Sequence, residues 1–358
     1  MELIPVNLLT GFLGSGKSTL LTEILENPEF CNTAVVVNEF GEVGLDGVLI
    51  EHTQDQIVEM TSGCLCCTIR GDIRQTLVDL HGKYVKDQIP KFNRVIVEST
   101  GLADPAPVVQ TLMSDSLLRN RYMLGGVIAT IDALHGAATI KNYKECEKQA
   151  AVADRLIITK SDLINDGVMR KTLNKLESKL FSLNPTAIVL DRHREDFEFG
   201  RLFDTSLYDP NTKSMDVRKW LNAEANATDH NHSHGDFHSS NDDHHHDITR
   251  HGSDIRSFTL TFEDPITIET LASSLEALLL TQGANILRVK GIVNTVDRPE
   301  HPLVVHGVQH VFHDPVWLDE WPNESRQTQL VFITFGVTRE SLDLFFKSWM
   351  STSNGIWR

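Results

Sequence analysis

Residues 11–19 read Gly11-Phe12-Leu13-Gly14-Ser15-Gly16-Lys17-Ser18-Thr19 and fit the phosphate-binding loop pattern G-x-x-x-x-G-K-[ST] at every fixed position. Residues 3–9 are an apolar run typical of a buried strand, and residues 20–25 have helical spacing. This context predicts a nucleotide site in which loop N–H groups and Lys17 hold phosphates while Ser18 coordinates Mg²⁺. The alternative is a glycine-rich turn that binds nothing, and the matching Lys and Ser argue against it.

The composition is that of a globular protein with room for two domains. The chain has 358 residues, of which 41% are hydrophobic and 23% charged, and no apolar run reaches the length of a membrane span. Its first residues enter the predicted strand without a basic leader, so we expect a cytoplasmic protein. The net charge of −16 disfavours nucleic acid and anionic membranes as partners.

An acidic, glycine-rich segment follows the second predicted strand, residues 33–38. It contains Glu39, Glu42 and Asp46. In a nucleotide-dependent switch, such a segment is a candidate for contacting Mg²⁺ or for positioning the attacking water. The alternative is a solvated surface loop.

Three cysteines, Cys64, Cys66 and Cys67, crowd into four positions after a predicted strand over residues 56–60. Thiolates bind Zn²⁺ or Cu⁺ well, and Gly63 allows the tight turn that would bring the thiols to one ion. Three sulfurs leave one tetrahedral position open, which Glu42 or a histidine would complete. A redox dithiol and inert buried cysteines are the alternatives.

The strand predicted over residues 92–98 ends at Glu98-Ser99-Thr100-Gly101. A carboxylate at this strand end is expected to support Mg²⁺, and the N–H of Gly101 is placed to sense a γ-phosphate. The pair is weak evidence alone. Together with the phosphate-binding loop it predicts the second half of the nucleotide site.

A guanine-specificity pattern, [NT]-K-x-D, ends the strand predicted over residues 155–159. It reads Thr159-Lys160-Ser161-Asp162. The Asp162 carboxylate can accept both the N1–H and the N2 amino group of guanine while the Lys160 stem packs on the base. The pattern therefore favours GTP over ATP. A helix N-cap is the alternative.

Taken together, these motifs resemble the CobW-like P-loop GTPases, relatives of the urease and hydrogenase nickel-insertion GTPases. The resemblance spans almost the whole chain. It implies a GTPase that binds zinc, with cobalt or nickel as alternatives, and couples GTP, GDP and Mg²⁺ to delivery of the metal to a client metalloprotein. By motif position it assigns the metal to Cys64, Cys66 and Cys67. It assigns phosphate and Mg²⁺ to Lys17, Ser18, Glu39 and Glu98, and the base to Lys160 and Asp162.

One position departs from a wider class of relatives. Those proteins use a second lysine, early in the loop, across a dimer interface, whereas this chain has Phe12 there. That mode of dimerisation has no support, although a homodimer or a metal-dependent oligomer of another kind is compatible with the sequence.

The segment of residues 222–253 is rich in histidine, Asp, Asn and Ser, and we expect a disordered linker. Imidazoles suit Zn²⁺, Ni²⁺, Cu²⁺ and Co²⁺, so the segment predicts many weak metal sites. A merely solvated linker is the alternative. The candidate ligands are His230, His232, His234, His238, His244, His245 and His246.

The predicted fold is α/β: a P-loop NTPase parallel sheet flanked by helices over residues 1–221, then the linker, then a smaller α+β domain over residues 254–358. The smaller domain is expected to contain strands at 255–262, 286–293, 303–312 and 328–334, and helices at 268–280 and 339–349.

The predicted function is a nucleotide switch. Loss of the γ-phosphate would move the cysteine segment and change its metal affinity, and hydrolysis would be slow because the motifs contain no evident arginine finger. Two other functions remain open at this stage. One is a passive zinc buffer with a structural nucleotide, and the other is a small-molecule kinase.

Overall fold

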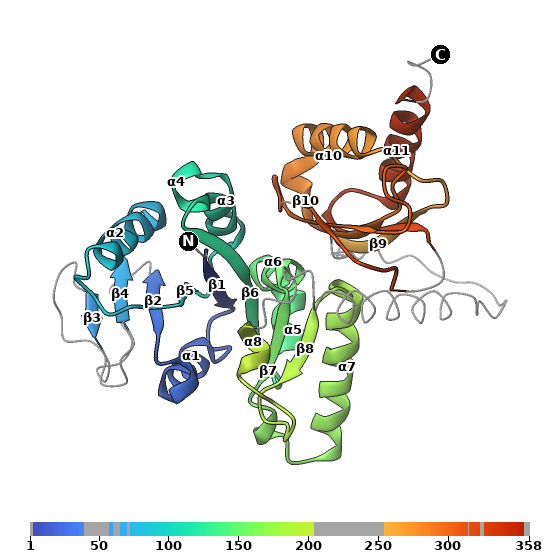
Figure 1. The fold of residues 1–358 in the computed structure, drawn as a ribbon. Helices are drawn as coiled ribbons and strands as arrows, with labels where there is room; N and C mark the ends of the chain where they lie inside the picture. The colour runs from blue at the N-terminus through green and yellow to red at the C-terminus, as the bar shows by residue number, and fades with distance from the viewer. Residues whose placement is uncertain are drawn as a thin grey trace, which may run out of the picture.

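The computed structural model describes residues 3–38, 57–59, 65–69, 72–203, 254–313, 315–322 and 326–353. Several predicted site residues lie outside these ranges: Glu39, Glu42, Cys64 and all the histidines named between residues 222 and 253. Within the described ranges, the chain forms two sheets with separate sets of helices (Figure 1).

The first sheet is eight-stranded in the order β3-β4-β2-β5-β1-β6-β7-β8. All neighbouring pairs are parallel except β3 and β4, which are antiparallel. Strand β1 (Ile4–Gly11) lies near the middle, between β5 and β6. The other strands are β2 (Thr33–Asn38), β3 (Ile57–Glu59), β4 (Leu65–Ile69), β5 (Arg94–Ser99), β6 (Tyr122–Asp132), β7 (Arg155–Thr159) and β8 (Ile188–Asp191).

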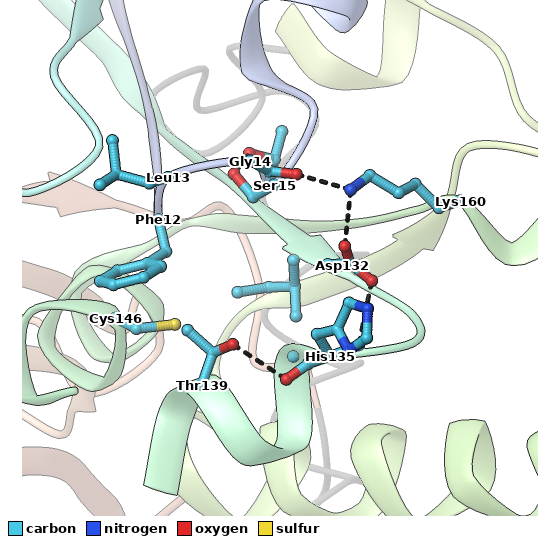
Figure 2. A pocket seen from close by; sticks show the side chains of 12 residues that line it. Phe12, Leu13, Gly14, Ser15, Asp132, His135, Thr139, Cys146 and Lys160 are labelled. Carbon is cyan, nitrogen blue, oxygen red and sulfur yellow. Dashed lines mark hydrogen bonds and ion pairs between the residues drawn. The ribbon is translucent and has the colours of Figure 1, made fainter. Parts of the chain in front are cut away.

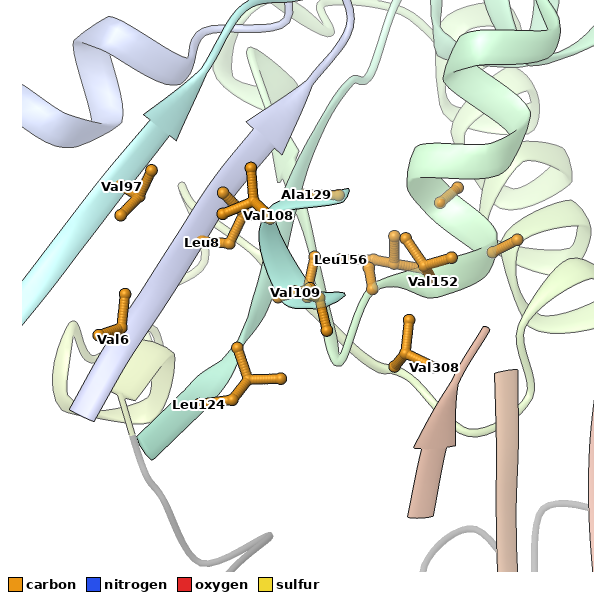
Figure 3. Close-up of a cluster of buried hydrophobic side chains, with 14 of the residues drawn as sticks. Val6, Leu8, Val97, Val108, Val109, Leu124, Ala129, Val152, Leu156 and Val308 are labelled. Atoms are coloured by element: carbon orange, nitrogen blue, oxygen red, sulfur yellow. The ribbon is translucent and has the colours of Figure 1, made fainter. Parts of the chain in front are cut away.

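Helices cover both faces of this sheet, and for this reason its central strands are continuous apolar runs rather than alternating ones. On β1, Leu8 packs into one core cluster and Leu9 into the other (Figure 3 shows part of the first). The Leu9 face is covered by α1 (Lys17–Glu26), the 3₁₀ turn Pro28–Phe30 and α8 (Gly200–Phe203). The opposite face is covered by α2 (Ile73–Val85), α3 (Ala106–Ser114), α4 (Ser116–Arg119), α5 (Gly136–Asn142), α6 (Lys144–Val152) and α7 (Gly167–Leu183).

Cys66 and Cys67 belong to a strand that was not predicted from the sequence, and the turn predicted at Gly63 lies outside the described residues. Strand β4 pairs in parallel with β2, so that Val35 is opposite Cys66 and Val36 opposite Cys67, and β3 pairs on its other side. The surrounding Leu, Thr and Ile residues favour an extended backbone, and pairing on both sides provides hydrogen-bond partners for its N–H and C=O groups.

The second sheet is antiparallel, in the order β12-β11-β10-β14-β9, with β13 paired to β11. Helices α10 (Ile268–Gln282) and α11 (Arg339–Ser353) pack against it and form a separate apolar core (Figure 1). The strand predicted over 303–312 is in fact a hairpin, because Gln309 adopts a left-handed φ of 48°. The strands are β9 (Ile255–Phe262), β10 (Ile286–Val293), β11 (Leu303–Val308), β12 (Val311–Phe312), β13 (Val316–Trp317) and β14 (Thr328–Phe335).

Apolar side chains join the two sheets. The core cluster of the first sheet continues into the second, and Figure 3 shows Val308 of β11 beside Val152 of α6. The residues that the second sheet contributes are Ile255, Leu287, Val308 and Ile333.

A buried polar network lies within this interface. The Arg288 guanidinium, from β10, donates to the Val152 carbonyl and to the Asp154 carboxylate, which is 1% exposed. The Lys290 ammonium lies 3.4 Å from the same carboxylate, and His306 Nε2 lies 2.8 Å from Arg288. The positive charges beside it outweigh burial and hold the pKa of Asp154 well below its usual value.

In the part of the chain that the structure describes, no helix is long and apolar enough to cross a membrane.

Replacing Arg288 by Met is expected to destabilise the protein. The variant leaves the Asp154 carboxylate buried without its main cation, which typically costs about 3 kcal/mol. Urea denaturation followed by tryptophan fluorescence measures this loss. Lys347→Met, which removes an exposed pair with Asp343, is the matched control and should cost at most about 0.5 kcal/mol. Equal losses of stability in the two variants would contradict the conclusion that Arg288 compensates the buried charge of Asp154.

The pH dependence of stability should contain a contribution from His306. Burial, and then the Arg288 charge, lower the pKa of this imidazole well below its usual value. Below about pH 6.5 the unfolded chain takes up a proton there and the folded chain does not, so stability falls as pH falls. For a single imidazole, the loss between pH 6.5 and 5 is at most about 1.7 kcal/mol. Denaturation of the wild type and of His306→Gln at both pH values isolates the contribution of this imidazole. Equal losses of stability in the two proteins between pH 6.5 and 5 would show that His306 makes no such contribution.

Candidate nucleotide and metal site

The loop of residues 11–16 connects the end of β1 to the start of α1 at the carboxyl edge of the parallel sheet. Gly16 has a φ of 90°, a left-handed conformation that favours glycine and lets the loop turn into the helix. The Ser15 hydroxyl lies 2.6 Å from the Thr130 hydroxyl. The Ser15 backbone carbonyl accepts a hydrogen bond from the Thr159 hydroxyl at 2.7 Å. Strands β6 and β7 thus hold the middle of the loop. Thr19 lies in the first turn of α1.

The Lys17 ammonium is folded back along the loop. It donates to the carbonyls of Gly11 at 2.7 Å and Phe12 at 3.2 Å. Burial lowers the pKa of Lys17, and the negative charge of Glu98 opposes that shift. The cation therefore lies within the loop that the sequence predicts to hold phosphates.

Ser18 and Glu98 come together from separate elements. Ser18 is in the first turn of α1, and Glu98 is near the end of β5, directly beside Leu9 of β1. The Ser18 hydroxyl donates to Glu98 Oε1 at 3.1 Å. A hydroxyl and a carboxylate are hard oxygen ligands of the type that Mg²⁺ prefers, so the donor set fits this ion.

Gly101 lies against the phosphate-binding loop. A Cβ built on Gly101 would be only 2.7 Å from the backbone nitrogen of Leu13, so the close approach requires glycine. The side-chain amide of Gln149, on α6, donates to the carbonyls of Gly101 and Ala103, both at 3.1 Å. The segment after β5 is therefore tied both to the loop and to α6.

Lys160 bridges the loop and β6. Its ammonium donates to the Gly14 carbonyl and to Asp132 Oδ2, both at 2.7 Å (Figure 2). Burial alone would raise the pKa of Asp132, but the Lys160 hydrogen bond and those from the N–H groups of His135 and Leu134 outweigh it and lower the pKa. Through these two hydrogen bonds, Lys160 connects the end of β7 to the phosphate-binding loop and to β6.

A pocket of about 190 Å³ lies beside this ion pair, between the loop and helices α5 and α6 (Figure 2). Phe12 and Cys146 form part of its apolar wall. Burial raises the pKa of the Cys146 thiol to about 12, so this cysteine lines the pocket as a neutral group.

Asp162 lies in the 3₁₀ turn Ser161–Leu163 after β7 and is half-exposed. Its Oδ1 lies 3.0 Å from His193 Nε2, in the loop after β8.

Three contacts around the site were not predicted from the sequence: those of Asp132, Gln149 and His193. Asp132 ends the largely apolar run of residues 125–132, which is a weak signal, whereas Gln149 and His193 have none.

The predicted metal ligands are only partly described. Cys66 and Cys67 lie in β4, while Cys64, Glu42 and Glu39 fall outside the described ranges. Among the residues that the structure does describe, no group of three His, Cys, Asp or Glu side chains is placed to hold a metal ion. The cysteine assignment therefore stays a prediction.

Comparison with protein families matches most of the chain. Residues 5–191 match the model described as CobW/HypB/UreG, nucleotide-binding domain. The chain belongs to the CobW/HypB/UreG family. Residues 255–349 match the cobalamin synthesis protein CobW C-terminal domain, so both sheets of this family member have a counterpart.

Curated relatives of this family member are named for zinc. Zinc chaperone YjiA of Escherichia coli is 32% identical, with 97% of this chain and 98% of the relative covered. Zinc chaperone CobW of Pseudomonas aeruginosa is 29% identical, with 92% and 87% covered. The crystal structure of Zn(II)-bound YjiA GTPase has a TM-score of 0.71 at 32% identity, covering 98% of this chain and 99% of that one.

Gly101→Ala is expected to weaken nucleotide binding at least tenfold, because the added methyl group displaces the backbone of Leu13 in the phosphate-binding loop. Titration with a fluorescent GDP analogue measures the affinity. Gly82→Ala, in α2 with nothing within 4 Å of the added Cβ, is the control and should bind normally. Affinities within twofold of each other would show that the close approach is unimportant.

Proposed function

We propose that this chain is a metal-handling GTPase, which couples GTP binding and hydrolysis to the binding of Zn²⁺ and its delivery to a client metalloprotein. The hydrogen bond between Ser18 and Glu98 carries the proposal, because it joins the two halves of the predicted phosphate and Mg²⁺ site. The family membership and the zinc-named relatives support it.

In the proposed reaction, water attacks the γ-phosphate of GTP, and GDP and phosphate are released. Backbone N–H groups of the loop, from Gly14 to Ser18, cradle the phosphates, and Lys17 contacts their β- and γ-oxygens. Gly101, held against Leu13, offers its N–H to the γ-phosphate. Ser18 and Glu98 would hold Mg²⁺, with Glu39 as a further predicted ligand, and the ion supplies positive charge for the phosphate oxygens.

Guanine is the proposed base, with Lys160 and Asp162 as the residues that hold it. Lys160 is already fixed by Gly14 and Asp132, so its stem is oriented before the base arrives. Asp162 offers a half-exposed carboxylate with two acceptor oxygens, which match the donor pair that guanine has and adenine lacks.

The sheet topology supports coupling between nucleotide and metal. Strand β2 pairs on one side with β4, which contains Cys66 and Cys67. On its other side it pairs with β5, which contains Glu98 as its second-last residue. The backbone of Asn38, where β2 ends, is opposite Ile69 in one register and Ser99 in the other. The proposed metal ligands are Cys64, Cys66, Cys67 and Glu42, and thiolates of this kind persist in a reducing cytoplasm.

A zinc titration tests the proposed coupling. The purified protein competes with a chelator for Zn²⁺, once in GDP and once in a non-hydrolysable GTP analogue. We expect the two affinities to differ by about tenfold, and the difference to disappear in Cys66→Ala. Cys31→Ala, which changes a cysteine outside the segment of residues 64–67, is the control and should keep it.

Coincident curves in the two nucleotides would contradict the switch and favour a passive zinc buffer. Release of inorganic phosphate, measured in parallel, tests the enzyme itself. We expect slow turnover in the wild type and none in Lys17→Ala, since phosphate stabilisation depends on this cation.

A further inference from the structure

The loop after β8 is built around one carboxylate, that of Asp191. This side chain accepts from the Ser161 hydroxyl and from the backbone N–H of His193, the latter at 3.0 Å. Its side chain is only 7% exposed. The same carboxylate therefore fixes the segment that contains Asp162 and the segment that contains His193.

A second anchor holds the same loop against the phosphate side of the site. Arg192 donates to Glu23 of α1 at 2.6 Å, and its backbone N–H donates to the Ile158 carbonyl of β7 at 2.8 Å. Arg192, the residue before His193, is thus tied to the helix and the strand that flank the nucleotide site.

The His193 imidazole reaches Asp162 from this fixed backbone, with Nε2 3.0 Å from Oδ1. Asp162 is 49% exposed, so little packing restrains the rotation of its carboxylate. Reading guanine needs both oxygens in one plane with the base, because N1–H and the N2 amino group donate in parallel. A carboxylate oxygen has two acceptor positions, so Oδ1 can serve His193 and the base together.

We propose that His193 is a positioning residue for guanine recognition, which orients the Asp162 carboxylate through this contact. The inference rests on the proposed function, since it assigns Asp162 to the base. His193 does not touch the phosphates in this scheme. It acts on the nucleotide only through the orientation of Asp162.

Competition of GDP and IDP against a fluorescent GDP analogue separates positioning from a general effect. The base of IDP keeps N1–H and lacks the N2 amino group, so it needs only one carboxylate oxygen. In His193→Ala we expect the GDP affinity to fall about tenfold and the IDP affinity about twofold, so that the preference for GDP shrinks about fivefold. His193→Gln, which keeps an N–H donor, should restore most of the preference.

Two further variants make the outcomes distinct. Glu195→Ala, at an exposed position of the same loop, is the matched control and should keep the wild-type preference. Asp162→Ala should abolish the preference, and if it does not, the guanine assignment itself fails. If Asp162→Ala behaves as expected while His193→Ala leaves the GDP to IDP ratio unchanged, the positioning role of His193 is wrong.

Discussion

The buried carboxylate of Asp154 connects the two sheets of this protein. It accepts from the backbone of Val127 in β6 at 2.9 Å, and it binds the Arg288 guanidinium that enters from the second sheet. Burying this charge is costly unless cations and hydrogen bonds surround it, as they do here. The C-terminal sheet is therefore needed to complete the polar interior of the nucleotide-binding domain.

The same principle of mutual restraint operates in the nucleotide site. The shape of the phosphate-binding loop depends on Thr130, Thr159 and Lys160, which lie in or directly after strands far away in the sequence. Preorganised N–H groups bind phosphate well only if they do not have to be ordered on binding. The strand ends supply that order in advance.

Local patterns in the sequence were sufficient for the loop and for most strands. Apolar runs predicted β1, β2, β5 and β7, because strands buried on both faces need apolar side chains at every position. Strand β4, in the cysteine segment, was not predicted because its strand character depends on pairing with β2 and β3. The hairpin at Gln309 was missed because a single left-handed residue has no distinct pattern outside Gly and Asn.

Contacts between distant residues could not be predicted in this way. Asp154 and Arg288 are 134 positions apart, and nothing near either residue indicates a partner. Asp162 was found because its motif is local, whereas His193, which contacts it, lies in a loop whose sequence is ordinary. Long-range geometry decides which polar side chain meets which, and a single sequence does not contain that geometry.

Helix α6 makes two contacts that give it a mechanical role. Near its middle, Gln149 holds the carbonyls of Gly101 and Ala103, and at its last residue the Val152 carbonyl accepts from Arg288. A helix of nine residues is short enough to move as one unit, because its own backbone hydrogen bonds hold it together. A shift of the Gly101 segment therefore either breaks the hydrogen bonds of Gln149 or moves α6, and with it the Val152 carbonyl that binds Arg288 of the C-terminal sheet.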